Sequence, residues 1–240
     1  MSTHFLSRFG LCFSALLAVA GVSTPSASAS AQPTQAKTCR PASAVSDARA
    51  LKGCAEIVGD VRIEGTTSQT LTELSALRRV KGTLVIANNP HLTSLEGLSS
   101  LRSVEGLVVR ENPVLETVQG LDALTEAPRV EFTGNRALDV LDGLNSLRHV
   151  SDLVVRNNGL FRLAGFQSLV SAGNVVIAQN PRLIYTSGLS RLVSVENLSL
   201  VKNPRLAPVS ISFRSLPAVK KELLVQGCPG ISPADLGRHG

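Results

Sequence analysis

The sequence of 240 residues has few aromatic side chains: seven Phe, one Tyr and no Trp. Phe5, Phe9 and Phe13 stand at the N-terminus, so the rest of the chain must build its core from Leu, Val, Ile and Ala. Nucleic-acid platforms stack bases on aromatic rings, and small-molecule pockets are commonly lined by such rings. The scarcity of rings therefore argues against both kinds of site. It favours a core of thin, repeated aliphatic layers.

Charged residues are also few, at 18%, whereas 43% of residues are hydrophobic. This balance excludes a disordered chain. The formal net charge is +6, and the Lys and Arg residues are scattered along the sequence. We interpret them as a solvated surface and expect no nucleic-acid partner, although another anionic partner stays open.

Long apolar runs are missing: none reaches the ~18 residues that a membrane span needs. Residues 1–31 nevertheless have the pattern of a secretory signal peptide, because Arg8 precedes an apolar stretch from Phe9 to Val22. Ala29-Ser30-Ala31 then offers a small-residue cleavage site. Retention of this stretch as an anchor is the alternative. We expect a secreted, periplasmic or cell-surface protein with no stable membrane span after signal cleavage.

Cysteines number four, one of them in the predicted signal peptide. An extracytoplasmic location permits disulfides. Cys39 and Cys54 bracket a short segment just before the first repeat, and we predict that they pair and cap the N-terminal end. Closing a loop of about 15 residues is worth roughly 3 kcal/mol. Cys228 is left unpaired.

Catalytic motifs are missing too, since H-x-x-x-H, G-x-S-x-G and C-x-x-C do not occur. His91 and His149 fall in different parts of the repeat described below, and His239 falls in the C-terminal tail. A polysaccharide-active β-helix enzyme would need clustered carboxylates in one groove, and the sequence predicts no such cluster. We therefore expect no enzyme activity, no catalytic residue, no cofactor and no metal.

The sequence does contain an internal repeat of about 23 residues. The unit L-x-V-x-x-N recurs with its Asn residues spaced by 23, 23, 23, 22 and 23 residues. Degenerate copies at the two ends carry Thr and Cys in place of Asn. The predicted ladder residues, one per repeat, are Thr66, Asn89, Asn112, Asn135, Asn158, Asn180, Asn203 and Cys228.

Each repeat is interpreted as one short strand followed by a bend. The period of two in L-x-V turns both apolar residues inward, and one strand per repeat builds a parallel sheet. Each Asn would satisfy backbone groups where the chain leaves the strand, and a Gly such as Gly97 or Gly188 permits a bend where a side chain would clash. Phe132, Phe161, Phe166 and Phe213 are expected to replace core Leu or Val.

We predict a right-handed parallel β-solenoid of about eight turns of about 23 residues. Short irregular or helical segments should lie on the side away from the sheet. The predicted organisation is a signal peptide at 1–31, a linker and N-terminal cap at 32–53, the solenoid at 54–232, and a C-terminal tail at 233–240.

The stretch from Leu77 to Leu98, LRRVKGTLVIANNPHLTSLEGL, resembles the receptor L domain of epidermal-growth-factor-type and insulin-type receptors. More broadly it is similar to the leucine-rich repeat. The resemblance covers about residues 54–232. It implies a right-handed solenoid that binds proteins or glycans outside the cell. The sequence shows no Cys-rich module and no kinase, so the resemblance does not extend to receptor signalling.

Strand alternation places one column of side chains at the centre of the exposed sheet face. That column is Arg62, Val85, Val108, Glu131, Val154, Val176, Ser199 and Leu224. An apolar stripe with polar neighbours is a common form of interaction site, although Val also simply suits a strand. Glu131 lies between Arg110 and Arg156 of neighbouring strands, as a polar contact point or a surface ion pair. The predicted binding residues are Val85, Val108, Arg110, Glu131, Val154, Arg156 and Val176.

The sequence thus predicts a secreted or cell-envelope recognition domain that binds a protein partner through the exposed face of a parallel sheet. One alternative is a structural envelope protein that binds cell-wall glycan, although the aromatic-poor face speaks against sugar stacking. A polysaccharide-active β-helix enzyme is the third interpretation, and the one with the least support.

Overall fold

The computed structural model describes residues 37–40, 44–45, 48–207, 219–232 and 236. The predicted signal peptide, Phe213, His239 and most of the predicted tail lie outside these described residues, and the predicted domain boundaries stay predictions. In chain order the described elements, with 3-10 helices labelled η, are β1 (Thr38–Cys39), β2 (Ala44–Val45), η1 (Ala48–Leu51), β3 (Glu56–Val58), β4 (Val61–Glu64), η2 (Thr72–Leu74), β5 (Arg79–Ala87), β6 (Ser103–Arg110), β7 (Arg129–Thr133), β8 (Val140–Leu141), β9 (His149–Arg156), β10 (Arg162–Leu163), β11 (Ser171–Ala178), η3 (Ser187–Leu189), β12 (Ser194–Val201) and β13 (Val219–Gln226).

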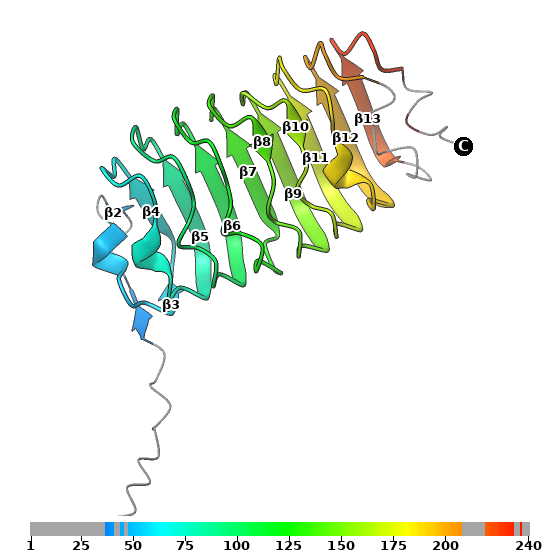
Figure 1. The fold of residues 1–240 in the computed structure, drawn as a ribbon. Helices are drawn as coiled ribbons and strands as arrows, with labels where there is room; N and C mark the ends of the chain where they lie inside the picture. Colours follow the sequence, from blue (N-terminus) through cyan, green and yellow to red (C-terminus); the bar gives the residue numbers. More distant parts are fainter. Residues whose placement is uncertain (1–36, 41–43, 46–47, 208–218, 233–235, 237–240) are drawn as a thin grey trace, which may run out of the picture. The chain divides into compact units, whose positions relative to one another are not determined.

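One sheet of parallel strands forms the main layer, shown in Figure 1. Its order is β1-β3-β5-β6-β7-β9-β11-β12-β13, and β2 pairs with β4, which pairs with β5. The strands that carry the repeat are joined by about seven turns of ~23 residues. Helix in the described residues consists of the short 3-10 segments η1, η2 and η3 and of 3-10 geometry at Leu236. The predicted parallel β-solenoid is therefore confirmed, with about seven turns between its strands.

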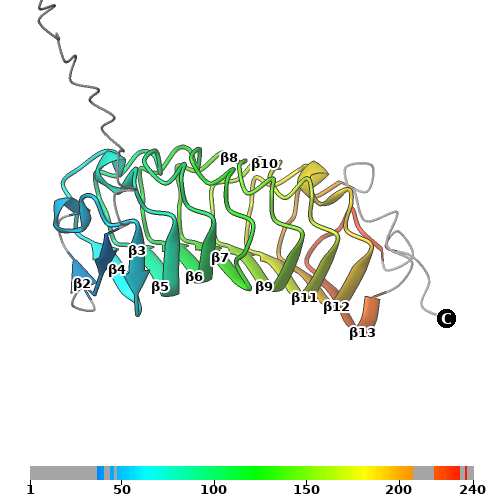
Figure 2. The same ribbon diagram turned by 90° about the horizontal axis from the view of Figure 1, so that it is seen from below.

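The connecting segments opposite the main sheet form a second layer, which we call the turn layer. It contains β8 and β10, which pair in parallel as a two-stranded sheet. Figure 2 shows β8 and β10 on the side opposite the row of main strands. η2 precedes β5 and η3 precedes β12, so the short helical segments lie between successive strands.

Aliphatic side chains fill the core between the two layers. Between β5 and β6, for example, Leu92 and Leu95 have no exposed surface. Phe132 and Phe166 are equally buried and take core positions, as predicted. Phe161 is partly exposed on the turn layer, so its predicted core position is wrong. The repeat is one residue shorter there, and Leu160 takes the buried position instead.

The eight ladder residues are all buried. Each Asn Oδ1 accepts the backbone N–H of the ladder residue one turn earlier, as Asn112 accepts from Asn89 at 3.1 Å. Its Nδ2 donates to a carbonyl oxygen of the preceding strand, as Asn112 does to Ile86 at 3.0 Å. These backbone groups would otherwise be buried without partners, so the ladder couples adjacent turns.

The residue before each ladder position has a left-handed backbone conformation, which the sequence interpretation missed. These residues, with φ between 51° and 74°, are Gly65, Asn88, Glu111, Gly134, Asn157, Gln179, Lys202 and Gly227. Gly and Asn tolerate this conformation well, whereas other residues adopt it at a cost of roughly 1–2 kcal/mol. The sharp corner that leads into each ladder residue is thus a second repeated element.

Two glycines allow successive turns to approach closely. A Cβ built on Gly188 would lie 1.7 Å from the carbonyl oxygen of Gly165, and one on Gly97 would lie 1.9 Å from that of Leu71. No side chain fits at these separations. The prediction that Gly permits a bend where a side chain would clash is confirmed at both positions.

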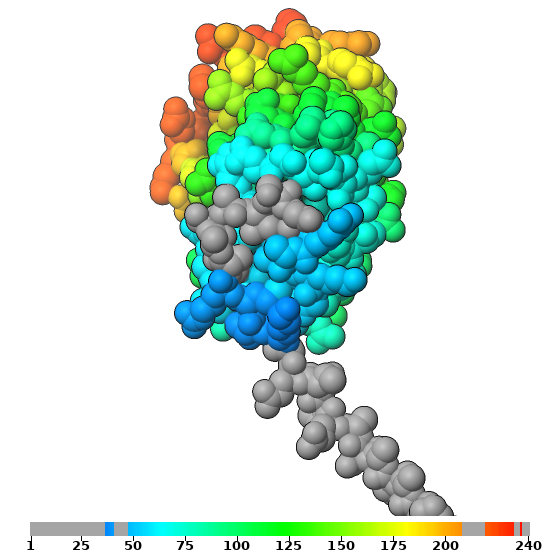
Figure 3. Space-filling view, turned by 90° about the vertical axis from the view of Figure 1, so that its left-hand side faces the viewer, coloured from blue at the N-terminus to red at the C-terminus, as the bar shows by residue number. Residues whose placement is uncertain are grey.

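The N-terminal end of the solenoid carries additional elements. Cys39 in β1 forms a disulfide with Cys54, as predicted. β1 pairs with β3, and η1 buries Ala48 and Leu51. Figure 3 looks onto this end and shows the blue and cyan residues of the first elements at the front of the stack.

Candidate binding face

The register of the main sheet brings the predicted central column together on its exposed face. Val85 is paired with Val108, and Val108 with Glu131. Val154 is paired with Glu131 on one side and with Val176 on the other. The column therefore forms one row across β5, β6, β7, β9 and β11, with a carboxylate between two pairs of valines.

This row is a shallow band rather than a broad apolar patch. Val108 is buried, with 7% of its surface exposed, and Val85, Val154 and Val176 are half-buried. The predicted central column continues beyond this row, and its most exposed residue is Leu224 on β13, at 42%. The apolar surface available to a partner is therefore greatest toward the C-terminal strands.

Glu131 is held by residues of its own strand. The Arg129 guanidinium donates to Glu131 Oε2 at 2.9 Å, and the Thr133 hydroxyl donates to Oε1 at 3.3 Å. Strand alternation places residues two apart on the same face, which explains both contacts. The carboxylate is therefore occupied by Arg129, an ion pair that the sequence interpretation did not foresee.

Arg110 and Arg156 lie on the strands beside β7, both paired in register with Thr133. Arg156 Nε donates to Gln179 Oε1 at 2.8 Å, one turn further along. In the described part of the chain no ion pair joins Glu131 to either arginine. The sheet brings the three residues near one another in the predicted order but does not connect them.

A row of hydrogen-bonded polar side chains crosses the sheet beside the valines. Asn174 Nδ2 donates to Asp152 Oδ1, and Asn197 Nδ2 donates to Asn174 Oδ1, both at 2.6 Å. Glu222 continues the row on β13, in register with Asn197. The sequence indicates that this column is polar, but the bonds between its members depend on the register of three strands.

A hollow of about 280 Å³ lies over β11, β12 and β13. Its lining residues are Asn174, Val175, Val176, Asn197, Leu198, Ser199, Glu222 and Leu224. The hollow thus joins the polar row to the most exposed part of the apolar column. Of the predicted binding residues, Val176 contributes to it.

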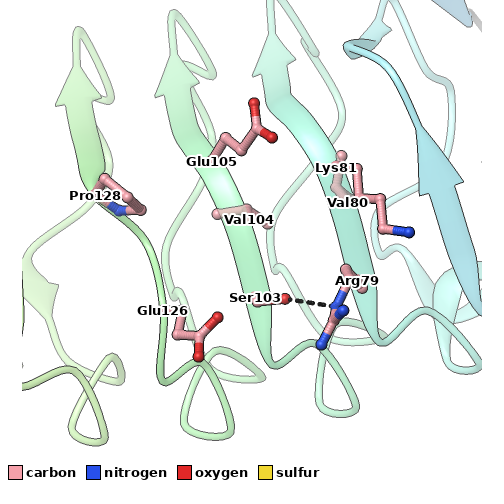
Figure 4. Close-up of a pocket in the computed structure, with 8 residues that line it drawn as sticks. All are labelled: Arg79, Val80, Lys81, Ser103, Val104, Glu105, Glu126 and Pro128. Carbon is pink, nitrogen blue, oxygen red and sulfur yellow. Dashed lines mark hydrogen bonds between the residues drawn. The ribbon is translucent and has the colours of Figure 1, made fainter.

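A second hollow, of about 420 Å³, lies where β5 and β6 begin and is shown in Figure 4. It is lined by Arg79, Val80, Lys81, Ser103, Val104, Glu105, Glu126 and Pro128. Arg79 Nε donates to Ser103 Oγ at 3.1 Å. The charged lining groups are two cations and two carboxylates, so their signs balance. None of the predicted binding residues lines this hollow.

Arg62 and Glu64 form an ion pair at the N-terminal end of the face. Arg62 Nη2 donates to Glu64 Oε1 at 2.9 Å, and Arg62 Nε donates to the other carboxylate oxygen. Together with a hydrogen bond from Asn88, these bonds lower the pKa of Glu64 from 4.5 to about 2. The same contact raises the pKa of Arg62. This end of the face stays charged over a wide pH range.

Other chemistry-bearing residues do not form a cluster. The described residues contain no group of three or more His, Cys, Asp or Glu that could hold a metal ion. No helix in the same part of the chain is long and apolar enough to span a membrane. His149 Nδ1 lies 2.6 Å from Ser171 Oγ, and Cys228 is free and buried at the end of the ladder.

The family model of the receptor L domain matches residues 53–127. This segment includes β3 to β6, and the repeat continues in parallel pairing through β13. No curated protein and no solved structure matches the chain. Receptor L domains are non-enzymatic domains that bind protein ligands in extracellular receptors. The match over residues 53–127 and the parallel β-solenoid together show that the chain resembles a receptor L domain.

Proposed function

We propose that this protein is an extracellular or cell-envelope recognition domain that binds a protein partner through the exposed face of the main sheet, without catalysis. The observation that carries the proposal is the in-register apolar row, flanked on one side by a polar row and on the other by a mixed row that includes Arg110, Thr133 and Arg156. A central apolar strip with a polar rim is a common composition for a protein interface. The match to a family of protein-binding domains supports the same function.

The structure shifts the centre of the proposed interface toward the C-terminal strands. The seven predicted binding residues remain its members, but Val108 is too buried to contribute much contact area. Val154 and Val176 are more accessible, and Leu224, two strands beyond Val176, is exposed. We therefore expect β9 to β13 to supply most of the contact.

An extracytoplasmic location is part of the proposal. Two features support it: the predicted signal peptide at residues 1–31 and the disulfide between Cys39 and Cys54. Disulfides form and persist mainly in oxidising compartments outside the cytosol.

Site-specific photo-crosslinking tests the sheet face. Residues 32–240 carrying a photoreactive amino acid at Ser199, on the exposed face, are mixed with the extracellular and envelope fractions of the producing cells. A matched variant carries the same group at Ser100, in the turn layer. We expect a discrete protein adduct from position 199, none from position 100, and loss of the adduct in Val154→Asp/Val176→Asp. An adduct that persists in this double variant while it stays folded would contradict the proposal, as would the absence of any protein adduct.

The polar row favours one second function, the binding of cell-wall glycan. Asp152, Asn174 and Asn197 present amide and carboxylate groups that can hydrogen-bond sugar hydroxyls. The exposed sheet face lacks aromatic rings among the described residues, so stacking would not contribute. Co-sedimentation with purified cell wall that is lost in Asn174→Ala/Asn197→Ala, but kept in Val154→Asp/Val176→Asp, would support the glycan function over the protein one.

A further inference from the structure

The turn layer carries a second surface, of different composition, around β10. Tyr185, the single Tyr of the chain, is 39% exposed there. The Phe161 ring meets it edge-on, with ring centroids 5.3 Å apart, and the guanidinium carbon of Arg162 lies 5.6 Å from the Tyr185 centroid. With Arg182 and Arg205, these residues form what we call the aromatic–arginine patch. Tyr, Phe and Arg are the residue types enriched at protein interfaces.

The equivalent positions of earlier turns have different residues. β-bridges align Arg162 with Val140 and with Tyr185, whereas the same column two turns earlier aligns Ser94 with Thr117. The neighbouring column runs, turn by turn, through Thr93, Glu116, Asp139, Phe161 and Ile184. The turn layer therefore changes from hydroxyl and acidic side chains to aromatic and basic ones near β8 and β10.

The patch coincides with the shortened repeat. The ladder positions 158 and 180 are 22 residues apart instead of 23, and the missing position lies next to Gly159. A Cβ on Gly159 would lie 2.0 Å from the carbonyl oxygen of Arg136, so no side chain can stand there. Arg182 reaches across this turn and pairs with Asp139, with 3.1 Å between Nη2 and Oδ1. The deletion thus lets a side chain from one turn contact a carboxylate two turns away.

The patch has a surplus of positive charge. Arg162, Arg182 and Arg205 stand on three consecutive turns, and all three are exposed. Asp139 is the carboxylate that pairs with Arg182. In the part of the chain that the structure describes, the ion pairs include neither Arg162 nor Arg205. Two guanidinium groups, each with bidentate donor geometry, therefore remain available to carboxylates.

We propose that the aromatic–arginine patch binds an extended acidic segment of a protein partner. Carboxylates of the segment engage Arg162 and Arg205, and an apolar side chain between them packs on Tyr185 and Phe161. Adjacent turns are ~4.8 Å apart, so the two arginines are separated by about 10 Å along the solenoid axis. Arg162 is aligned with Tyr185, five residues after Asn180, whereas Arg205 stands two residues after Asn203, so the two arginines also lie in different columns of the turn layer. Three residues of extended peptide, at ~3.4 Å each, cover the axial part of this separation, so an obliquely lying segment with a carboxylate at every third residue can reach both side chains.

The ring geometry favours a peptide over a sugar as the occupant. A sugar binds an aromatic residue by stacking on an open ring face. Arg162 lies over the Tyr185 ring, and Phe161 meets that ring in an edge-on contact. A guanidinium group packed on an aromatic ring instead suits carboxylates with nearby apolar side chains. The surface also lies on the layer opposite the sheet face, so both sites can be occupied at once.

Fluorescence anisotropy with the labelled peptide (Glu-Ser-Phe)4 tests the patch, using residues 32–240 at low ionic strength. The matched peptide (Lys-Ser-Phe)4 checks the sign of the charge. We expect saturable binding of the Glu peptide that weakens at least fivefold in Arg162→Ala and in Tyr185→Ala. Tyr185→Phe keeps the ring and should bind within twofold of the unchanged protein. The control Thr117→Ala, two turns earlier in the same column, should bind the peptide normally.

Arg162 and Tyr185 are exposed on the turn layer, so we expect their variants to keep the fold. Urea unfolding of each variant checks this expectation. Equal binding of the Lys peptide would overturn the proposal, as would Glu-peptide binding that is unchanged in Arg162→Ala. Failure of the unchanged protein to bind the Glu peptide would do the same. If oligogalacturonate binds instead, and is lost in Arg162→Ala and Tyr185→Ala, the patch is an acidic-glycan site and the peptide proposal is wrong.

Discussion

The two ends of the solenoid are built from the same repeat but differ in the elements that cover them. At the N-terminal end β1 and β2 add to the sheet beyond the repeat, and the Cys39–Cys54 disulfide ties β1 to the chain just before β3. Ile57 and Ile63, which face the core there, have no exposed surface. This end is therefore covered by local elements and held by a covalent bond.

The C-terminal end relies on non-covalent contacts in the described residues. β13 is the last strand of the main sheet, and its core-facing Leu223 and Val225 are only partly buried. Lys220 and Lys221 on this strand are exposed, a common way to discourage pairing with another chain. The ladder ends in Cys228, whose sulfur lies 3.9 Å from Asn203 Nδ2.

The difference shows what a terminal turn lacks. In a solenoid each turn is stabilised mainly by its two neighbours, so an end turn misses one interface. The N-terminal end compensates with a disulfide and added strands, whereas among the described residues the C-terminal end has the last ladder contacts and the buried side chains of Ile231 and Leu236. We therefore expect unfolding to begin at β13, and four predictions test this comparison.

The largest effect is expected from Asn203→Ala, near the C-terminal end. Asn203 Oδ1 accepts hydrogen bonds from Asn180 N–H and Nδ2, and its Nδ2 donates to Ile177 O at 2.7 Å. Leaving buried polar groups unpaired costs roughly 1–3 kcal/mol each, so we expect a loss of roughly 4 kcal/mol. Urea denaturation measures the loss, and hydrogen exchange should show β12 and β13 opening together.

Asn197→Ala is the matched control for this variant. Its amide lies on the exposed face of the same turn, so its removal should change stability by less than about 0.5 kcal/mol. Equal losses in the two variants would show that the buried ladder does not hold the C-terminal turns.

Removal of the disulfide, by Cys39→Ala/Cys54→Ala, should cost somewhat less. The two cysteines are 15 residues apart, and a loop of this length is worth roughly 3 kcal/mol. Without it, exchange protection of β3 and β4 should fall to the level of β12 and β13, which removes the difference between the ends. Protection that stays higher at β3 and β4 would mean that the added strands, rather than the covalent bond, secure this end.

Cys228→Asn should produce a smaller change, in the stabilising direction. An Asn side chain would offer Asn203 the carbonyl oxygen that every earlier ladder Asn provides to the turn before it. One or two new hydrogen bonds are worth about 1 kcal/mol each. A higher urea midpoint than that of the unchanged protein is expected, with Cys228→Ser as the control that keeps a small polar group. A lower midpoint would indicate that the buried thiol packs better than an amide.

The sequence was sufficient to predict the fold because its signals are periodic. A repeated Asn, a strand with period two and regularly spaced Leu residues determine which side chains face inward. The same spacing identifies Cys228 as the residue that takes the place of Asn in the last repeat. The corner before each Asn was missed because its positive φ is shared by residues as different as Gly134, Glu111 and Lys202. The residue type at such a position does not reveal a backbone conformation that the adjacent ladder residue imposes.

The candidate site was harder to predict, since it depends on departures from the repeat. The valine row followed from strand alternation, but the shallow exposure of Val108 depends on its neighbours in three strands. Phe161 was misplaced because a deletion of one residue moves every following side chain by one position. Tyr185 stands one turn further along, and its surroundings become apparent only when the turns are stacked. The change from Ser94 and Thr117 to an aromatic residue in that column is a signal that could have revealed it.

The smallest effect concerns the charged pairs that stand at the two ends of the sheet face. Near the N-terminus Arg62 and Asn88 lower the pKa of Glu64 to about 2. Near the C-terminus Lys221 donates to Glu196 at 2.7 Å and lowers the pKa of that carboxyl. A carboxyl whose pKa is lower in the folded state stabilises the fold above its ordinary pKa of 4.5, and this contribution is lost as the pH falls below it.

Both contributions to folding stability should therefore decrease on acidification, and the contribution of Glu64 should be fully lost only below a pH of about 2. An NMR titration of the Glu side-chain carboxyl carbons measures the two pKa values directly. Arg62→Ala should return the pKa of Glu64 toward 4.5 and leave that of Glu196 unchanged, and Lys221→Ala should do the reverse. If Glu64 titrates near 4.5 in the unchanged protein, Arg62 does not lower its pKa. The ion pair then does not stabilise the N-terminal end in addition to the disulfide.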